Sequence, residues 1–295
     1  MYDFRRSNKL HRVEDGAQAR LPDFVCIGAP KCGTTWLFDN LHEHPEVFVP
    51  DFKETNYFSV SRWGAEYESQ PLSYYLSFFK NAPASTVVGD ISTNVLHDPY
   101  CGERLQALVP DAKIVVMLRD PVSRAQSHYF HTKHRAGSVG ASMLELLEDP
   151  RRDGAGILSQ GLYGEQIERL FEYVDEDRVI VVLFDDIIDN PERVYEWLCE
   201  ELDIDSSFVP IPLGESRTRR TLARSIGVPH SRSNRARDES VWTRFSAPVD
   251  QIDRHCRRHQ QVERSRSGQS FAERDRGSKI ERLLPPRHRK TWSLA

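Results

Sequence analysis

Short apolar runs alternate with amphipathic segments along the first two thirds of the chain. Buried strands are predicted where the runs are brief and apolar throughout, at residues 24–29, 86–89, 113–118 and 178–184. Helical spacing or a flanking proline predicts helices at residues 34–42, 72–79, 99–108, 121–133, 159–173 and 191–202. Apolar strands that alternate with helices predict an α/β fold, in which a parallel sheet carries helices on both faces.

This pattern ends near residue 215, where the charge also changes sign. Residues 1–215 contain 36 acidic and 20 basic side chains, whereas residues 216–295 contain 8 acidic and 20 basic ones, 18 of them arginine. We therefore predict an N-terminal extension (1–20), an α/β domain (21–215) and an irregular Arg-rich C-terminal segment (216–295). Three interpretations of the last segment stay open: a basic tail that binds an anionic polymer, a divergent closing segment, or an altered reading frame.

Composition narrows the class of protein further. No apolar run approaches the ~20 residues that span a bilayer, and the charged N-terminus lacks the apolar region of a secretory signal. We therefore expect a cytoplasmic protein without a transmembrane segment. The five cysteines form no C-x-x-C pair, so neither a zinc site nor a disulfide framework is predicted, and no metal is expected to be required.

The first candidate site is the turn at residues 28–36, which reads Gly-Ala-Pro-Lys-Cys-Gly-Thr-Thr-Trp between a predicted strand and a predicted helix. Such a turn presents backbone N–H groups and a helix N-terminus to an anion. Lys31 adds positive charge, Gly33 permits close backbone approach, and Thr34 and Thr35 add hydroxyl donors. The glycine spacing is that of the nucleotide-triphosphate loop G-x-x-x-x-G-K-[ST], but the lysine is displaced, which argues against an ATPase or an ordinary kinase.

A second set of phosphate-binding residue types follows the predicted strand at residues 113–118. Arg119 ends this strand, and Ser127 lies eight residues later in the next predicted helix. Arginine suits this position because its guanidinium can bond phosphate oxygens in pairs. Arg124, between the two, is expected to be structural or to lie on the helix surface. Both motifs follow strands of one parallel sheet, so we expect them at its carboxyl edge, where ligands bind.

On these motifs the sequence resembles the family of sulfotransferases that use 3'-phosphoadenosine-5'-phosphosulfate (PAPS). Residues 30–36 read like the family's Pro-Lys-x-Gly-Thr-Thr-x loop, and residues 119–129 read like its Arg-x-Pro-x-x-Arg-x-x-Ser-x-Tyr segment. The resemblance spans about residues 24–205. It implies a P-loop-like sheet and the transfer of a sulfuryl group from PAPS, as co-substrate, to a hydroxyl or amine acceptor.

The resemblance also implies where PAPS binds. The 5'-phosphosulfate is expected at the first loop, on Lys31, Cys32, Gly33, Thr34 and Thr35. Trp36 is expected to stack on the adenine, and Arg119 and Ser127 are expected to bind the 3'-phosphate. Tyr163, in a Gly-x-Tyr turn, is expected near the cofactor, where a packed core tyrosine is the alternative. Further candidates for the 3'-phosphate are Arg217, Arg219 and Arg220.

Sulfuryl transfer needs a base for the acceptor and a charge that stabilises the leaving phosphate. The candidate bases are Glu54, Asp90, His97, His128 and His131. Glu54 lies in Lys-Glu-Thr-Asn-Tyr-Phe, which resembles the Lys-Glu-x-x-Phe-Phe segment of the carbohydrate-type branch, where the glutamate is the catalytic base. We therefore expect Glu54 to be catalytic, Lys53 to contact the sulfonate or a polar acceptor, and Lys31 to stabilise the leaving phosphate. Asp90, as a second carboxylate in the cleft, or a histidine stays an alternative.

The expected acceptor is a glycan, a glycolipid or a small alcohol, and nucleic acid is not expected as a partner. Its identity and the oligomeric state are left open. Two other functions also stay open, a P-loop kinase-like phosphotransferase and a non-catalytic protein that binds 3'-phosphoadenosine-5'-phosphate (PAP). Turnover of PAPS would distinguish a sulfotransferase from the non-catalytic PAP-binding protein. Magnesium-dependent use of ATP would indicate the kinase.

Overall fold

The structure, a computed structural model, describes residues 11–12, 18–59, 71–136 and 140–214. The predicted Arg-rich segment lies outside the described residues, and so do the candidate arginines at positions 217, 219 and 220. The chain divides into two compact units, and the sheet and both sequence motifs belong to the larger one, which comprises residues 1–139 and 155–226. Of the second unit, the described part is residues 140–154, with helix α6 (Met143–Glu148) and the short helix η2 (Pro150–Arg152).

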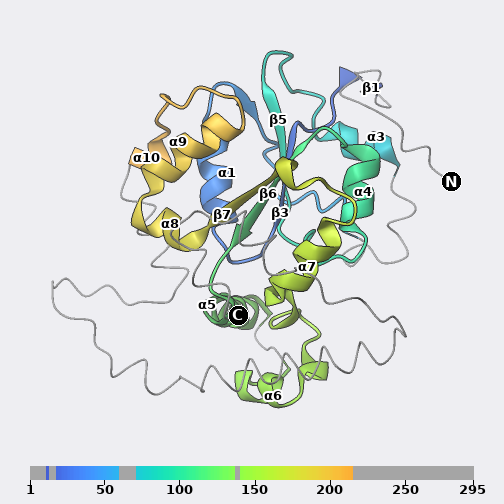
Figure 1. The fold of residues 1–295 in the computed structure, drawn as a ribbon, viewed down its shortest axis with the longest axis vertical. Helices are drawn as coiled ribbons and strands as arrows, with labels where there is room; N and C mark the ends of the chain where they lie inside the picture. Colours follow the sequence, from blue (N-terminus) through green and yellow to red (C-terminus); the bar gives the residue numbers. More distant parts are fainter. Residues whose placement is uncertain (1–10, 13–17, 60–70, 137–139, 215–295) are drawn as a thin grey trace. The chain divides into compact units, whose positions relative to one another are not determined.

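Five parallel strands form the central sheet, in the order β4-β5-β3-β6-β7 (Figure 1). Their bounds are β3 (Phe24–Gly28), β4 (Val47–Phe48), β5 (Val87–Ile91), β6 (Lys113–Leu118) and β7 (Val179–Leu183). Strands β3 and β7 are buried along their whole length, which explains why their sequences are apolar without alternation. A separate antiparallel pair joins β1 (His11–Arg12) to β2 (Gln18–Ala19). The parallel sheet predicted from the sequence is confirmed.

Helices cover both faces of the sheet (Figure 1). On one side lie α1 (Thr34–His42), α8 (Phe184–Asp189), α9 (Pro191–Glu201) and α10 (Ile211–Gly214). On the other side lie α3 (Leu72–Ser77), α4 (Cys101–Leu108) and α7 (Tyr163–Leu170). Contacts between α1 and α10 and between α4 and α7 hold each layer together. The remaining long helix, α5 (Pro121–Ala136), starts after β6.

Several elements differ from the prediction, and strand β4 and helices α6, α8 and α10 were not predicted. The helix expected at 159–173 is a short helix η3 (Ser159–Gly161) followed by α7, with a break at Leu162. The strand expected to reach residue 184 ends at Leu183, because Phe184 begins α8. The apolar run continues through Phe184 and hides this boundary. Two aspartates follow it in the first turn of α8, where negative charge is favourable at a helix N-terminus.

The strand order places a topological switch point between β3 and β6. The chain runs from β3 to β4 at one edge of the sheet, comes back to form β5 beside β3, and then crosses to the other side of β3 to form β6. The helices after β3 and β5 therefore lie on opposite faces, and the loops at these carboxyl ends separate to leave a crevice. No helix in the described ranges is long and apolar enough to cross a membrane. The cytoplasmic location stays a prediction.

Candidate active site

The loop between β3 and α1 depends on two glycines in backbone conformations that L residues rarely adopt. Gly28 has a φ of 129°, and a Cβ there would lie 2.4 Å from the carbonyl oxygen of Thr93. Gly33 caps α1 with a φ of 97°, and its Cβ would lie 3.2 Å from side-chain atoms of both Phe184 and Ile187. Only glycine fits both positions without strain. The loop therefore closes tightly and opens the N-terminus of α1 to an anion.

A cleft of about 860 Å³ opens beside this loop. Eight of the residues predicted to bind or act on the substrates line it, namely Lys31, Gly33, Thr34, Thr35, Trp36, Lys53, Glu54 and Ser127. The structure thus brings together side chains from the first loop, from the segment between β4 and α3, and from α5. Burial lowers the pKa of Lys31, and the nearby cations Lys53 and Arg119 act in the same direction. Such crowding of positive charge favours an anionic ligand.

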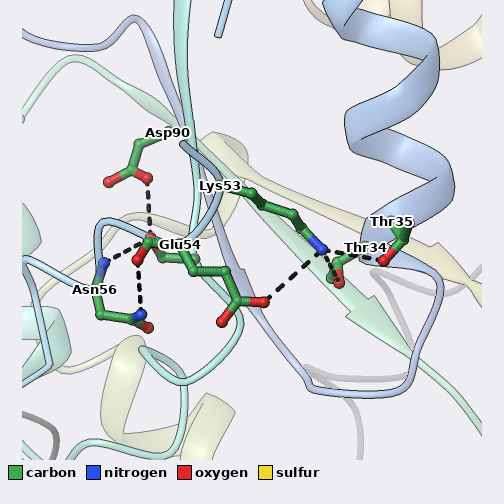
Figure 2. Close-up of polar contacts among 7 residues, drawn as sticks. Thr34, Thr35, Lys53, Glu54, Asn56 and Asp90 are labelled. Atoms are coloured by element: carbon green, nitrogen blue, oxygen red, sulfur yellow. Dashed lines mark hydrogen bonds and ion pairs between the residues drawn. The ribbon is translucent and has the colours of Figure 1, made fainter. Parts of the chain in front are cut away.

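Lys53 joins the phosphate loop to Glu54 (Figure 2). Its Nζ donates to the hydroxyl oxygens of Thr34 at 3.3 Å and Thr35 at 3.2 Å, and it lies 3.8 Å from Oε1 of Glu54. The side chains of Lys53 and Glu54 are 20% and 29% exposed, so the pair is partly shielded from water. Glu54 therefore lies beside the residues predicted to hold the 5'-phosphosulfate. The sequence placed Lys53 near the acceptor or sulfonate but did not indicate its contacts with the two threonines.

Arg119 lies beneath the loop rather than on the wall of the cleft. Its side chain is 8% exposed. Its guanidinium donates a long hydrogen bond of 3.4 Å to the carbonyl oxygen of Lys31 and lies 4.4 Å from the ring centroid of Phe184. Ser127, in contrast, lines the cleft from α5. Both residues thus lie at the carboxyl edge, one against the loop backbone and one on the open surface.

Cys32 and Tyr163 form a buried pair under the same loop. The Cys32 Sγ lies 3.5 Å from the Tyr163 hydroxyl oxygen and donates to the carbonyl oxygen of Pro30 at 3.6 Å. Burial raises the pKa of the Cys32 thiol to about 11 and also raises the pKa of Tyr163. The thiol is therefore neutral near pH 7, and neither side chain lines the cleft. Their contacts support the loop from below.

The structure distinguishes the alternative candidate bases by whether they line the cleft. Asp90 was an alternative base, as a second carboxylate in the cleft, but it is 1% exposed and does not line the cleft, which argues against that role. His97 does not line it either, whereas His128 and His131 do. Burial lowers the pKa of His131, as do Lys31 and other nearby cations.

Arg124 has the structural role expected of it. Its side chain is fully buried, it donates to the carbonyl oxygen of Ile157, and one guanidinium nitrogen lies 3.3 Å from Nδ1 of His128. Two further residues that line the cleft after β5, Thr93 and Asn94, were not predicted from the sequence. Their place at the carboxyl end of a predicted strand was the signal that could have indicated them.

A doubly wound parallel sheet with a glycine-dependent loop at its switch point is an arrangement typical of nucleotide-binding proteins of the α/β class. Within this class, the sulfotransferase domain family matches residues 21–264. The chain therefore belongs to the sulfotransferase family. The match continues past residue 215 into the Arg-rich segment.

Curated relatives agree with this assignment. The chain is 29% identical over 191 residues to a bifunctional heparan sulfate N-deacetylase/N-sulfotransferase 1 from Caenorhabditis elegans, a match of 62% of this chain and 22% of the relative. It is 30% identical over 152 residues to carbohydrate sulfotransferase 15 from Mus musculus, a match of 38% and 27% respectively. The chain thus spans about a quarter of the length of these relatives.

Among solved structures, a sulfotransferase from Alicyclobacillus acidocaldarius is similar, with a TM-score of 0.59 and 28% sequence identity. The similarity covers 70% of this chain and 92% of that one. The predicted fold class, a P-loop-like parallel sheet with helices on both faces, is confirmed by this similarity and by the observed strand order.

Proposed function

We propose that this protein transfers the sulfuryl group of PAPS to a hydroxyl or amine acceptor. The observation that carries the proposal is the pair Lys53–Glu54, whose ammonium group contacts both threonine hydroxyls of the phosphate loop and lies 3.8 Å from the carboxylate. A carboxylate beside an anion-binding loop is the arrangement that base-assisted transfer from an anionic donor requires. Membership of the sulfotransferase family supports the same reaction.

The residues present fit PAPS. The two glycines let the loop pack closely against Thr93 and Phe184 and turn its backbone towards an anion, and Lys31 lies at the cleft with its positive charge. The 5'-phosphosulfate would be held by Lys31, by the loop at Cys32 and Gly33, and by Thr34 and Thr35. Trp36 would contact the adenine, Ser127 and Arg119 would bind the 3'-phosphate, and Tyr163 would support the loop. PAPS supplies the sulfuryl group, and PAP is the product that leaves.

In this mechanism each side chain at the site has its own role. Glu54 accepts the proton of the acceptor hydroxyl or amine as it becomes a nucleophile, which is typically worth ~10²–10⁴ in rate. Lys31 presents its ammonium group to the negative charge that develops on the 5'-phosphate. Thr34 and Thr35 accept hydrogen bonds from Lys53, so their own hydroxyl hydrogens are available for oxygen atoms of the donor.

For the acceptor we propose a carbohydrate or a glycolipid. The relatives whose names specify a substrate act on heparan sulfate or carbohydrate. The cleft has room for a bulky polar group, and hydroxyl, amide, imidazole and carboxylate side chains all contribute to its wall. These groups suit the many hydrogen-bond donors and acceptors of a sugar.

The deciding experiment measures PAP release from PAPS with panels of glycans, glycolipids and phenols. We expect release that depends on a glycan or glycolipid and that is lost in Lys31→Ala. PAP binding without release for any acceptor would indicate the non-catalytic PAP-binding protein instead. Magnesium-dependent phosphate transfer from ATP would indicate the kinase-like alternative.

A further inference from the structure

The backbone at Glu54 has an uncommon conformation. Glu54 has a φ of 72° and Asn56 a φ of 51°, so two residues of one short turn lie in the left-handed region. For a residue such as glutamate this region costs roughly 1–2 kcal/mol, whereas asparagine adopts it more readily. Such a conformation persists only where the surrounding structure holds it in place. The contacts of this turn therefore determine where the Glu54 carboxylate lies.

Strand β5 and its C-terminal extension hold the turn through hydrogen bonds to the backbone. The N–H of Glu54 donates to the carbonyl oxygen of Ile91 at 3.0 Å, and the N–H of Asn56 donates to Oγ of Ser92 at 3.0 Å. The side-chain amide of Asn56 donates back to the carbonyl oxygen of Glu54 at 2.9 Å. Both backbone polar groups of Glu54 are thus fixed, which leaves only its side chain to point into the cleft.

Asp90 lies behind this turn and accepts hydrogen bonds from three hydroxyl groups. Figure 2 shows the hydrogen bond that comes from the turn. Its Oδ2 accepts from Thr55 at 2.7 Å and from Tyr75 at 2.9 Å, and its Oδ1 accepts from Ser92 at 2.9 Å. Burial raises the pKa of Asp90, and the hydroxyl donors act in the opposite direction. Because Ser92 donates its one hydrogen to Asp90, its oxygen lone pairs face the N–H of Asn56. The carboxylate therefore orients the hydroxyl that holds the turn.

From this arrangement we propose that Asp90 is a positioning residue, which places the Glu54 carboxylate beside the phosphate loop by holding the turn at residues 54–56. Asp90 holds the turn in two ways. It accepts a hydrogen bond directly from Thr55, and it orients Ser92, which in turn accepts from the N–H of Asn56. Lys53 restrains the other side, since it contacts the Glu54 side chain and the threonines of the loop. The proposal rests on the proposed function, because it assigns Asp90 an effect on catalysis that is exerted through Glu54.

The test is a double-mutant cycle of Asp90→Asn and Glu54→Gln. We expect Asp90→Asn alone to lower kcat by ~10²-fold, the loss typical of a misplacement of about 1 Å, and to leave the Kd for PAP within about 2-fold. In the Glu54→Gln background the same substitution should cost less than about 3-fold, because residues that act as a unit are not additive. An equal loss in both backgrounds would show a general structural role and overturn the proposal. So would wild-type kcat in Asp90→Asn.

A milder pair of variants keeps the test valid if Asp90→Asn does not fold. Thr55→Val removes the hydroxyl that donates to Asp90 at 2.7 Å and keeps the size of the side chain. We expect a ~10-fold lower kcat with unchanged PAP affinity, by the same misplacement argument, and Thr55→Ser should recover most of the rate. Equal kcat for the valine and serine variants would overturn the proposal. Full activity in Glu54→Gln is a different result, because it would contradict the proposed base itself.

Discussion

Replacing Glu54 by glutamine tests the proposed base with little change to the structure. The backbone contacts that hold residue 54 involve its N–H and carbonyl groups, so Glu54→Gln leaves them in place. The variant removes one charge, the ion pair of 3.8 Å with Lys53, and the ability to accept a proton near neutral pH. Size and one carbonyl-type oxygen are retained.

The expected effects on stability and on rate differ enough to be separated. The Lys53–Glu54 pair is partly exposed, and such pairs are worth ~0.2–1 kcal/mol, so the free energy of unfolding should fall by no more than about 1 kcal/mol. Loss of a general base costs ~10²–10⁴ in kcat. That range corresponds to ~3–5 kcal/mol in activation free energy. The rate should therefore fall far more than the lost ion pair explains.

The assay compares kcat at saturating PAPS and acceptor with the Kd for PAP and with Tm. Asp39→Asn is a matched control, because Asp39 also lines the cleft and does not contact the phosphate loop through any hydrogen bond that the structure describes. We expect Asp39→Asn to keep kcat within about 3-fold of wild type, as typical of a carboxylate without a role in proton transfer. If Glu54→Gln stays within about 3-fold as well, the base lies elsewhere, and His128 and His131 become the candidates on the wall of the cleft.

Three further predictions concern the phosphate loop. Lys31→Ala should lower turnover by ~10²–10³, as typical for one lost charge stabiliser, while PAP keeps its 3'-phosphate contacts; turnover within a few-fold of wild type would contradict this role. PAP should raise Tm more than ATP does at equal concentration, because it binds more tightly; at 100 times its Kd it stabilises the folded state by ~2.7 kcal/mol. Equal stabilisation by PAP and ATP at equal concentration would argue against a 3'-phosphate site at Arg119 and Ser127. Gly33→Ala should lower both Tm and PAP affinity, because its Cβ would crowd Phe184 and Ile187 at 3.2 Å and its φ is 97°. Gly164→Ala, where a Cβ meets nothing within 4 Å, is the control and should stabilise α7 by ~0.5–1 kcal/mol.

The sequence alone determined the elements whose signal is local. The helix at residues 34–42 and the strand at 113–118 were predicted with their observed bounds, because apolar periodicity and flanking turn residues lie within the elements themselves. The glycines of the phosphate loop were identified for the same reason, since a tight turn between a strand and a helix needs backbone conformations that few residues adopt.

The tertiary structure decided what the carboxylates and cations near the cleft do. In the sequence, Glu54 and Asp90 are both acidic residues close to short strands, and both were candidate bases. Only the packing of Thr55 against Asp90, 35 positions apart, shows that one carboxylate is enclosed by hydroxyl groups while the other faces the cleft. Likewise, Lys53 meets Thr34 and Thr35 only because β5 lies next to β3. Burial and long-range hydrogen bonds depend on the arrangement of the whole sheet, which no local pattern encodes.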